Sequence, residues 1–117
     1  MKGRTPNAAE KRWHDQVASV GCIACILDGN DSPPVSIHHI AGRTQKDAHW
    51  LVLPLCSGNH QHGTGIPGLI AVHPYKARFE ARYGKQLDLL GRVCEILCGQ
   101  GVDVPQEVNQ ALLARGH

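Results

Sequence analysis

Five cysteines and eight histidines give this chain of 117 residues an excess of metal-binding side chains. Cys22 and Cys25 form a Cys-x-x-Cys pair, and Cys56 stands four positions before His60. Two thiolates on one turn, with a third thiolate and an imidazole on another, supply the tetrahedral ligand set that zinc prefers. A redox role would explain a lone Cys-x-x-Cys pair, but it requires neither the third thiol nor the histidines. The spacing therefore predicts a zinc site.

The adjacent pair His38-His39 is a second candidate for chemistry, because it lies in a segment with strand-like alternation. Neighbouring residues of a strand point to opposite faces, and a metal-binding or catalytic role readily explains two imidazoles there. The alternative is a partly exposed pair whose nitrogens bond to the backbone. His73 precedes Pro74 at an expected helix start, where it can point at a metal or act as a cap.

Other cysteines and histidines are assigned to packing or to the surface. Cys94 and Cys98 lie four positions apart in a leucine-rich segment, where a free cysteine behaves as a small hydrophobic residue. His14, beside Trp13, and the terminal His117 carry no spacing that relates them to the other ligands.

The first elements along the chain must position the thiols of Cys22 and Cys25. Asn7 as a possible N-cap, Glu10 three positions later and Gly21 as a stop predict a helix over residues 7–20. Residues 22–34 carry turn chemistry, so we expect a zinc knuckle and loop there rather than a regular element.

The later elements follow from alternation, apolar spacing and punctuation by proline and glycine. Two antiparallel strands are expected, the second confined to an edge or a strand end by Pro54. A short helix should then carry His60 and His62. The expected strands cover residues 35–40 and 51–55, and three further helices cover residues 74–83, 86–98 and 105–115.

Composition fits one small domain with a weak aromatic core. Only 4% of the residues are aromatic, so we expect a bound metal to help stabilise the fold. We expect a zinc-stabilised α+β domain spanning residues 1–117. Its parts would be an N-terminal helix over 1–20, a metal-binding core over 21–84 and C-terminal helices over 85–117.

Charge and hydropathy bear on compartment and partners. The first fifteen residues hold charges and no apolar stretch, and no run approaches the roughly 18 apolar residues of a membrane span. We therefore expect a cytoplasmic protein, where an odd number of thiols favours metal binding over disulfides. Net charge is only +2, but local basic clusters can meet DNA phosphates, with solvated helix faces as the alternative. The candidate DNA contacts are Arg43, Lys46, Lys76 and Arg78.

The order of these motifs resembles a known superfamily. A Cys-x-x-Cys pair, a strand ending in His-His-Ile and the run LVLPLC before a metal-binding histidine are similar to the HNH nucleases over residues 22–62. The strings HHIAGRTQKDAHWLVLPLCSGNHQHG and IAVHPYKARFEARYG look more particularly like the Ref, or recombination enhancement function, nucleases of phages and prophages. The resemblance implies an HNH-like ββα-metal core with additional helices and much loop.

The same resemblance implies an activity and roles for residues. The expected activity is metal-dependent cutting of duplex DNA in recombination, with RecA filaments as partner and a bacterial cytoplasm as location. His38 would bind a divalent ion, Mg or Zn, and His39 would be the general base that takes a proton from water. His60 would be the ligand carried by the helix.

Two departures from the HNH pattern leave alternatives open. The motif's Asn would fall near Leu51, so His49 or Asn59 must replace it. Asn59 also stands where a fourth thiol is usual, so a histidine must complete the zinc site. Our working division gives His60, His38 and His73 to the catalytic ion and leaves His62, or His49, to the structural zinc. The alternative function is a catalytically silent zinc module that binds DNA or RecA and modulates recombination.

Overall fold

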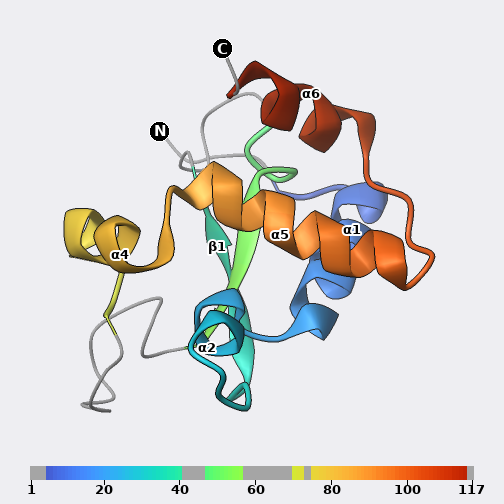
Figure 1. The fold of residues 1–117 in the computed structure, drawn as a ribbon. Coiled ribbons are helices and arrows are strands. Elements are labelled where there is room, and N and C mark those ends of the chain that lie inside the picture. Colours follow the sequence, from blue (N-terminus) through green and yellow to red (C-terminus); the bar gives the residue numbers. More distant parts are fainter. Residues whose placement is uncertain (1–4, 41–46, 57–69, 73–74, 116–117) are drawn as a thin grey trace.

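A two-stranded antiparallel sheet carries His38, His39 and Cys56, and helices pack around it (Figure 1). The structure, a computed structural model, describes residues 5–40, 47–56, 70–72 and 75–115. It is a small α+β fold, as expected. The elements in chain order are α1 (Ala8–Val20), α2 (Ile23–Leu27), β1 (Val35–His39), β2 (Val52–Cys56), α4 (Lys76–Tyr83), α5 (Gln86–Gly99) and α6 (Gln106–Ala114).

The strand pair confirms the prediction of two antiparallel strands. His38 of β1 lies opposite Leu53, and His39 lies opposite Val52. Because side chains alternate along a strand, the two imidazoles leave the sheet on opposite faces. Pro54 sits within β2, which is tolerable because each strand of a two-stranded sheet has one edge without a ladder partner.

Helix α1 begins where its capping signal predicts. The side chain of Asn7 accepts from the Glu10 amide at 2.9 Å, and the Glu10 carboxylate accepts from the Asn7 amide at 2.9 Å. This reciprocal box satisfies two amides that the first turn would otherwise leave unpaired. Gly21 ends the helix with φ +92°, and a Cβ there would lie 3.0 Å from the Ser32 side chain. Glycine is therefore required by both conformation and space.

The prediction of a loop after Gly21 was wrong in part, because residues Ile23–Leu27 form the short helix α2. The amide of Ile26 donates to the Cys22 carbonyl at 3.0 Å, which closes the first turn. Ile23, Ala24 and Cys25 are buried, so tertiary packing stabilises a helix too short to form alone. Turn residues begin only after it. Cys22 is consequently an N-cap and Cys25 a helical residue.

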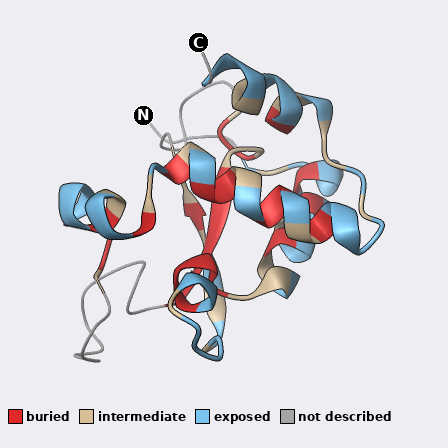
Figure 2. Cartoon of the chain, viewed as in Figure 1, coloured by how far each residue is buried: buried red, intermediate tan, exposed pale blue. Residues whose placement is uncertain are grey.

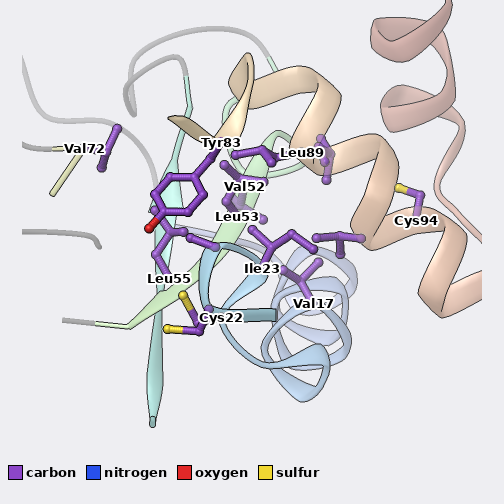
Figure 3. Packing of buried hydrophobic residues seen from close by; sticks show 14 of the residues in the cluster. Val17, Cys22, Ile23, Val52, Leu53, Leu55, Val72, Tyr83, Leu89 and Cys94 are labelled. Carbon is purple, nitrogen blue, oxygen red and sulfur yellow. The ribbon is translucent and has the colours of Figure 1, made fainter. Parts of the chain in front are cut away.

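Strand β2 is the centre of the core. All five of its residues are buried, so both faces of the strand are covered (Figure 2). Helices α1, α2 and α5 contact it, and α5 also contacts α6. The close view in Figure 3 shows Val52, Leu53 and Leu55 among side chains from these helices, with Cys22 at one margin.

The later helices lie close to their predicted bounds. Helix α4 begins at Lys76 with Tyr75 as N-cap. Helix α5 ends one residue later than expected, and α6 is one residue shorter than expected at each end. Cys94 on α5 is buried, which agrees with a packing role, whereas Cys98 is exposed. Among the helices that the structure describes, none is both long and apolar enough to cross a membrane.

Candidate metal centre and histidine cluster

Three buried thiols converge from two parts of the chain. Cys22 and Cys25 come from the start of α2, and Cys56 comes from the last position of β2. Their sulfur atoms all lie within 4.8 Å of one another, and the Sγ atoms of Cys25 and Cys56 are 3.7 Å apart. Tetrahedral zinc with bonds of about 2.3 Å places its sulfur ligands about 3.8 Å apart. The geometry therefore fits a zinc ion held by these three thiolates.

Without a bound ion, the surroundings of the thiols favour their protonated form. Burial raises the pKa of both Cys22 and Cys25, because a thiolate loses solvation there, and neighbouring thiols add repulsion. A bound divalent ion offsets that repulsion and draws off the protons. A fourth ligand completes a tetrahedral site. Of the two histidines proposed for it, His62 lies outside the described residues, and His49 clusters with His14 and His39 rather than with the thiols.

His39 faces His49, ten positions later. The two rings meet edge to face with centroids 5.1 Å apart, and His39 Nε2 lies 3.0 Å from His49 Nδ1. One of these nitrogens carries the proton that the other accepts, so each ring determines the tautomer of its neighbour. His49 was one of two residues that the sequence offered in place of the HNH Asn, and its ring contacts His39.

His14 joins this pair from helix α1, although sequence reasoning assigned it to surface or packing. Its Nε2–H donates to the His49 carbonyl at 2.7 Å, while the neighbouring Trp13 indole donates to the Trp50 carbonyl at 3.0 Å. Nitrogens of His14, His39 and His49 all lie within 4.8 Å of one another. Consecutive side chains of one helix thus hold the turn that carries His49.

His38 points instead toward the start of α5. Its Nε2 lies 2.6 Å from Gln86 Oε1, and Gln86 Nε2 donates to Glu80 Oε2 at 3.2 Å. Since the amide oxygen must accept, His38 donates through Nε2 and keeps its lone pair on Nδ1. Glu80 also lies 3.6 Å from the Lys85 ammonium. A chain of polar contacts therefore joins a buried imidazole to a carboxylate on α4.

The other predicted site residues divide between α4 and the undescribed ranges. Lys76 and Arg78 are exposed on α4, and the Arg78 guanidinium stacks 5.7 Å from the centroid of the Tyr75 ring. These side chains are open to a partner. The remaining candidates, Arg43, Lys46, Asn59, His60, His62 and His73, lie outside the described residues, so their predicted roles stay predictions.

The fold and the two clusters define a small α+β protein with three buried thiols that could hold a metal ion and, at the other end of the strand ladder, a group of three histidines. Residues 6–98 match the family described as recombination enhancement, RecA-dependent nuclease. That match spans most of the sequence, and the chain belongs to this family. It confirms the resemblance to the Ref nucleases. The matched range includes the thiol centre, the three clustered histidines and Gln86, whereas α6 lies beyond it.

Proposed function

We propose that this chain is a metal-dependent DNA endonuclease of the HNH type that cuts duplex DNA in association with RecA filaments. The observation that carries the proposal is the contact between His39 Nε2 and His49 Nδ1 at 3.0 Å. If His39 donates through Nε2, its lone pair stays on Nδ1, the nitrogen that takes a proton from the attacking water. His49 then does what the HNH Asn would do, which is to orient the base and determine its tautomer.

His38 would hold the catalytic ion, together with His60 and His73. Its Nε2–H donates to the Gln86 amide oxygen, and metal-binding histidines ordinarily donate the N–H of their second ring nitrogen to an oxygen in this way. A divalent ion, Mg²⁺ or Zn²⁺, supplies charge stabilisation at the leaving 3′ oxygen when bound. The products would carry 5′-phosphate and 3′-hydroxyl ends.

The zinc centre has a structural part in this proposal. The buried thiols tie α2 to the end of β2, and β1 pairs with β2 next to it. The same sheet carries the proposed base and the proposed metal ligand on opposite faces. Zinc bound by three thiolates would therefore hold the strands that position both histidines.

The basic side chains offer a surface for DNA. Lys76 and Arg78 are exposed on α4, and this helix also carries Glu80, the carboxylate at the end of the chain of contacts from His38. Phosphate contacts from α4 would thus act close to the proposed catalytic ligand. RecA dependence comes to this chain from its family, and we propose that the filament presents the duplex to be cut.

The test is cutting of circular duplex DNA by purified protein with RecA, ATP, a homologous oligonucleotide and Mg²⁺. Wild type should cut, His39→Ala should lose at least about 100-fold in rate, and His117→Ala should match wild type. His49→Asn, which restores the usual HNH amide, should keep more activity than His49→Ala. Undiminished cutting by His39→Ala would overturn the assignment of the base. A wild type that binds DNA or RecA but never cuts would favour the silent zinc module.

A further inference from the structure

The proposed cutting reaction uses His39 and His49 but gives no role to His14, the third member of their cluster. We propose that these three histidines form a second metal site, separate from the thiol centre, for a transition ion such as Zn²⁺ or Ni²⁺. One nitrogen from each ring lies within 4.8 Å of the other two. That spacing is compatible with three ligands converging on one ion.

The donor set selects the class of ion. Three neutral imidazoles suit zinc, nickel and copper, whereas magnesium and calcium prefer oxygen ligands. Within the part of the chain that the structure describes, the cluster contains only histidines. Three histidines with one position left for water form an open tetrahedral site. The expected occupant is therefore a borderline transition ion rather than Mg²⁺.

The supporting contacts have the form that metal-binding histidines usually show. His14 donates Nε2–H to the His49 carbonyl at 2.7 Å, which orients its ring and leaves the lone pair on Nδ1. His49 is 2% exposed, and its turn is held by the Trp13 indole through the Trp50 carbonyl. Helix α1 is in turn held at its start by the Asn7 capping box. The rings are thus positioned before any ion arrives.

Binding at this site has a consequence for His39, which rests on the proposed function. The proton shared between His39 Nε2 and His49 Nδ1 must leave before both nitrogens can bind an ion. An imidazole bound through Nε2 carries its one remaining proton on Nδ1, so it cannot accept another proton there. Occupancy of the cluster and action of His39 as base therefore exclude each other, and the ion would inhibit cutting.

The direct test is calorimetric titration of untagged protein, purified with zinc in its thiol centre, with Ni²⁺ as the probe. In a His60→Ala background, which removes a ligand of the proposed catalytic ion, the protein should bind one Ni²⁺ with no loss of zinc. His14→Ala and His49→Ala should each weaken that binding at least about 10-fold, while His117→Ala should leave it unchanged. His14→Gln separates the metal role from folding, because its amide can still donate to the His49 carbonyl. It should fold like wild type and bind Ni²⁺ as weakly as His14→Ala.

Wild-type Ni²⁺ affinity in the folded His14→Gln variant would overturn the site. So would binding that His60→Ala abolishes while the His14 variants leave it intact. A second measurement adds Ni²⁺ to the cutting reaction in excess Mg²⁺, where occupancy should suppress cutting in parallel with the binding curve. The binding result does not depend on cutting, so failure of the proposed function and failure of this site are distinguishable.

Discussion

The buried imidazole of His38 and the buried amide of Gln86, which are 48 positions apart, meet at 2.6 Å between Nε2 and Oε1. The contact joins β1 to the first residue of α5. It places a positioning residue for the proposed catalytic ligand on a helix whose sequence indicated only packing.

Replacing Gln86 should therefore weaken the catalytic ion. In Gln86→Leu the His38 N–H loses its acceptor and the ring its preferred orientation, so affinity for the ion should fall about 10- to 100-fold. The measurement is the rate of DNA cutting as a function of Mg²⁺ concentration, in which the midpoint should move upward while thermal unfolding stays cooperative. Gln100→Ala, at the exposed end of α5, is the control. An unchanged midpoint in folded Gln86→Leu would remove the positioning role.

Loss of a zinc ligand should have a much larger effect on folding than loss of an exposed thiol. Cys56→Ser removes one of three converging sulfur atoms, and the binding energy of structural zinc is folding energy. We expect destabilisation of at least about 3 kcal/mol, together with loss of stoichiometric zinc. Cys98→Ser is the matched control, because that thiol is exposed on α5. Urea unfolding and elemental analysis measure both effects; equal stability of the two variants would contradict a zinc centre at Cys56.

Alkaline pH should destabilise the protein through Cys94. Burial raises the pKa of this thiol from 9.0 to about 11, so the folded state retains the proton that the unfolded chain releases. Its contribution to stability is complete below pH 9 and is lost as pH rises through about 11. At pH 11 the loss should be about 2 kcal/mol. The free energy of unfolding of zinc-loaded protein, compared between pH 8 and pH 11, should fall less in Cys94→Ala than in wild type or Cys98→Ala. If the unfolding free energies of Cys94→Ala and wild type depended identically on pH, Cys94 would not be the cause of the loss.

Removing the exposed cations of α4 should weaken binding to all DNA sequences to the same extent. The double change Lys76→Ala and Arg78→Ala deletes two candidate phosphate contacts, so the slope of log affinity against log salt should become shallower by about 2. Fluorescence anisotropy over a salt series provides that slope. Arg92→Ala, an exposed cation on α5, serves as the comparison. Equal slopes for the two variants would place the DNA elsewhere.

Local signals predicted most of the secondary structure. The capping box of α1, the alternation of β1 and the glycine after α4 each act within a few residues, and the elements begin and end close to where they indicate. Helix α2 escaped prediction because five residues carry too little periodicity. Buried contacts made by Ile23 and Cys25, rather than local propensity, stabilise it.

The thiol site was predictable from the spacing of its residues. Contacts that only the fold creates were not predictable. The Cys-x-x-Cys pair and Cys56 were recognised as one site from their residue types, and their sulfur atoms do converge. His14 was missed because it contacts the His49 carbonyl across 35 positions, and a single histidine on an amphipathic helix gives no sign of that partner. Gln86 was missed for the same reason, since a polar residue at a helix start ordinarily indicates exposure.

A metal ion bound at Cys56, the last residue of β2, would help to fix the register of the strand pair. Cys56 pairs with Val35, and four pairs further along the ladder His39 pairs with Val52. A slip of one residue would turn every side chain of the moving strand to the other face. For β1, that slip would exchange the places of His38 and His39. An ion held by Cys56 together with Cys22 and Cys25 would pin one end of β2 against α2, the helix that directly precedes β1. It would thereby help to preserve which imidazole faces His49 and which faces Gln86.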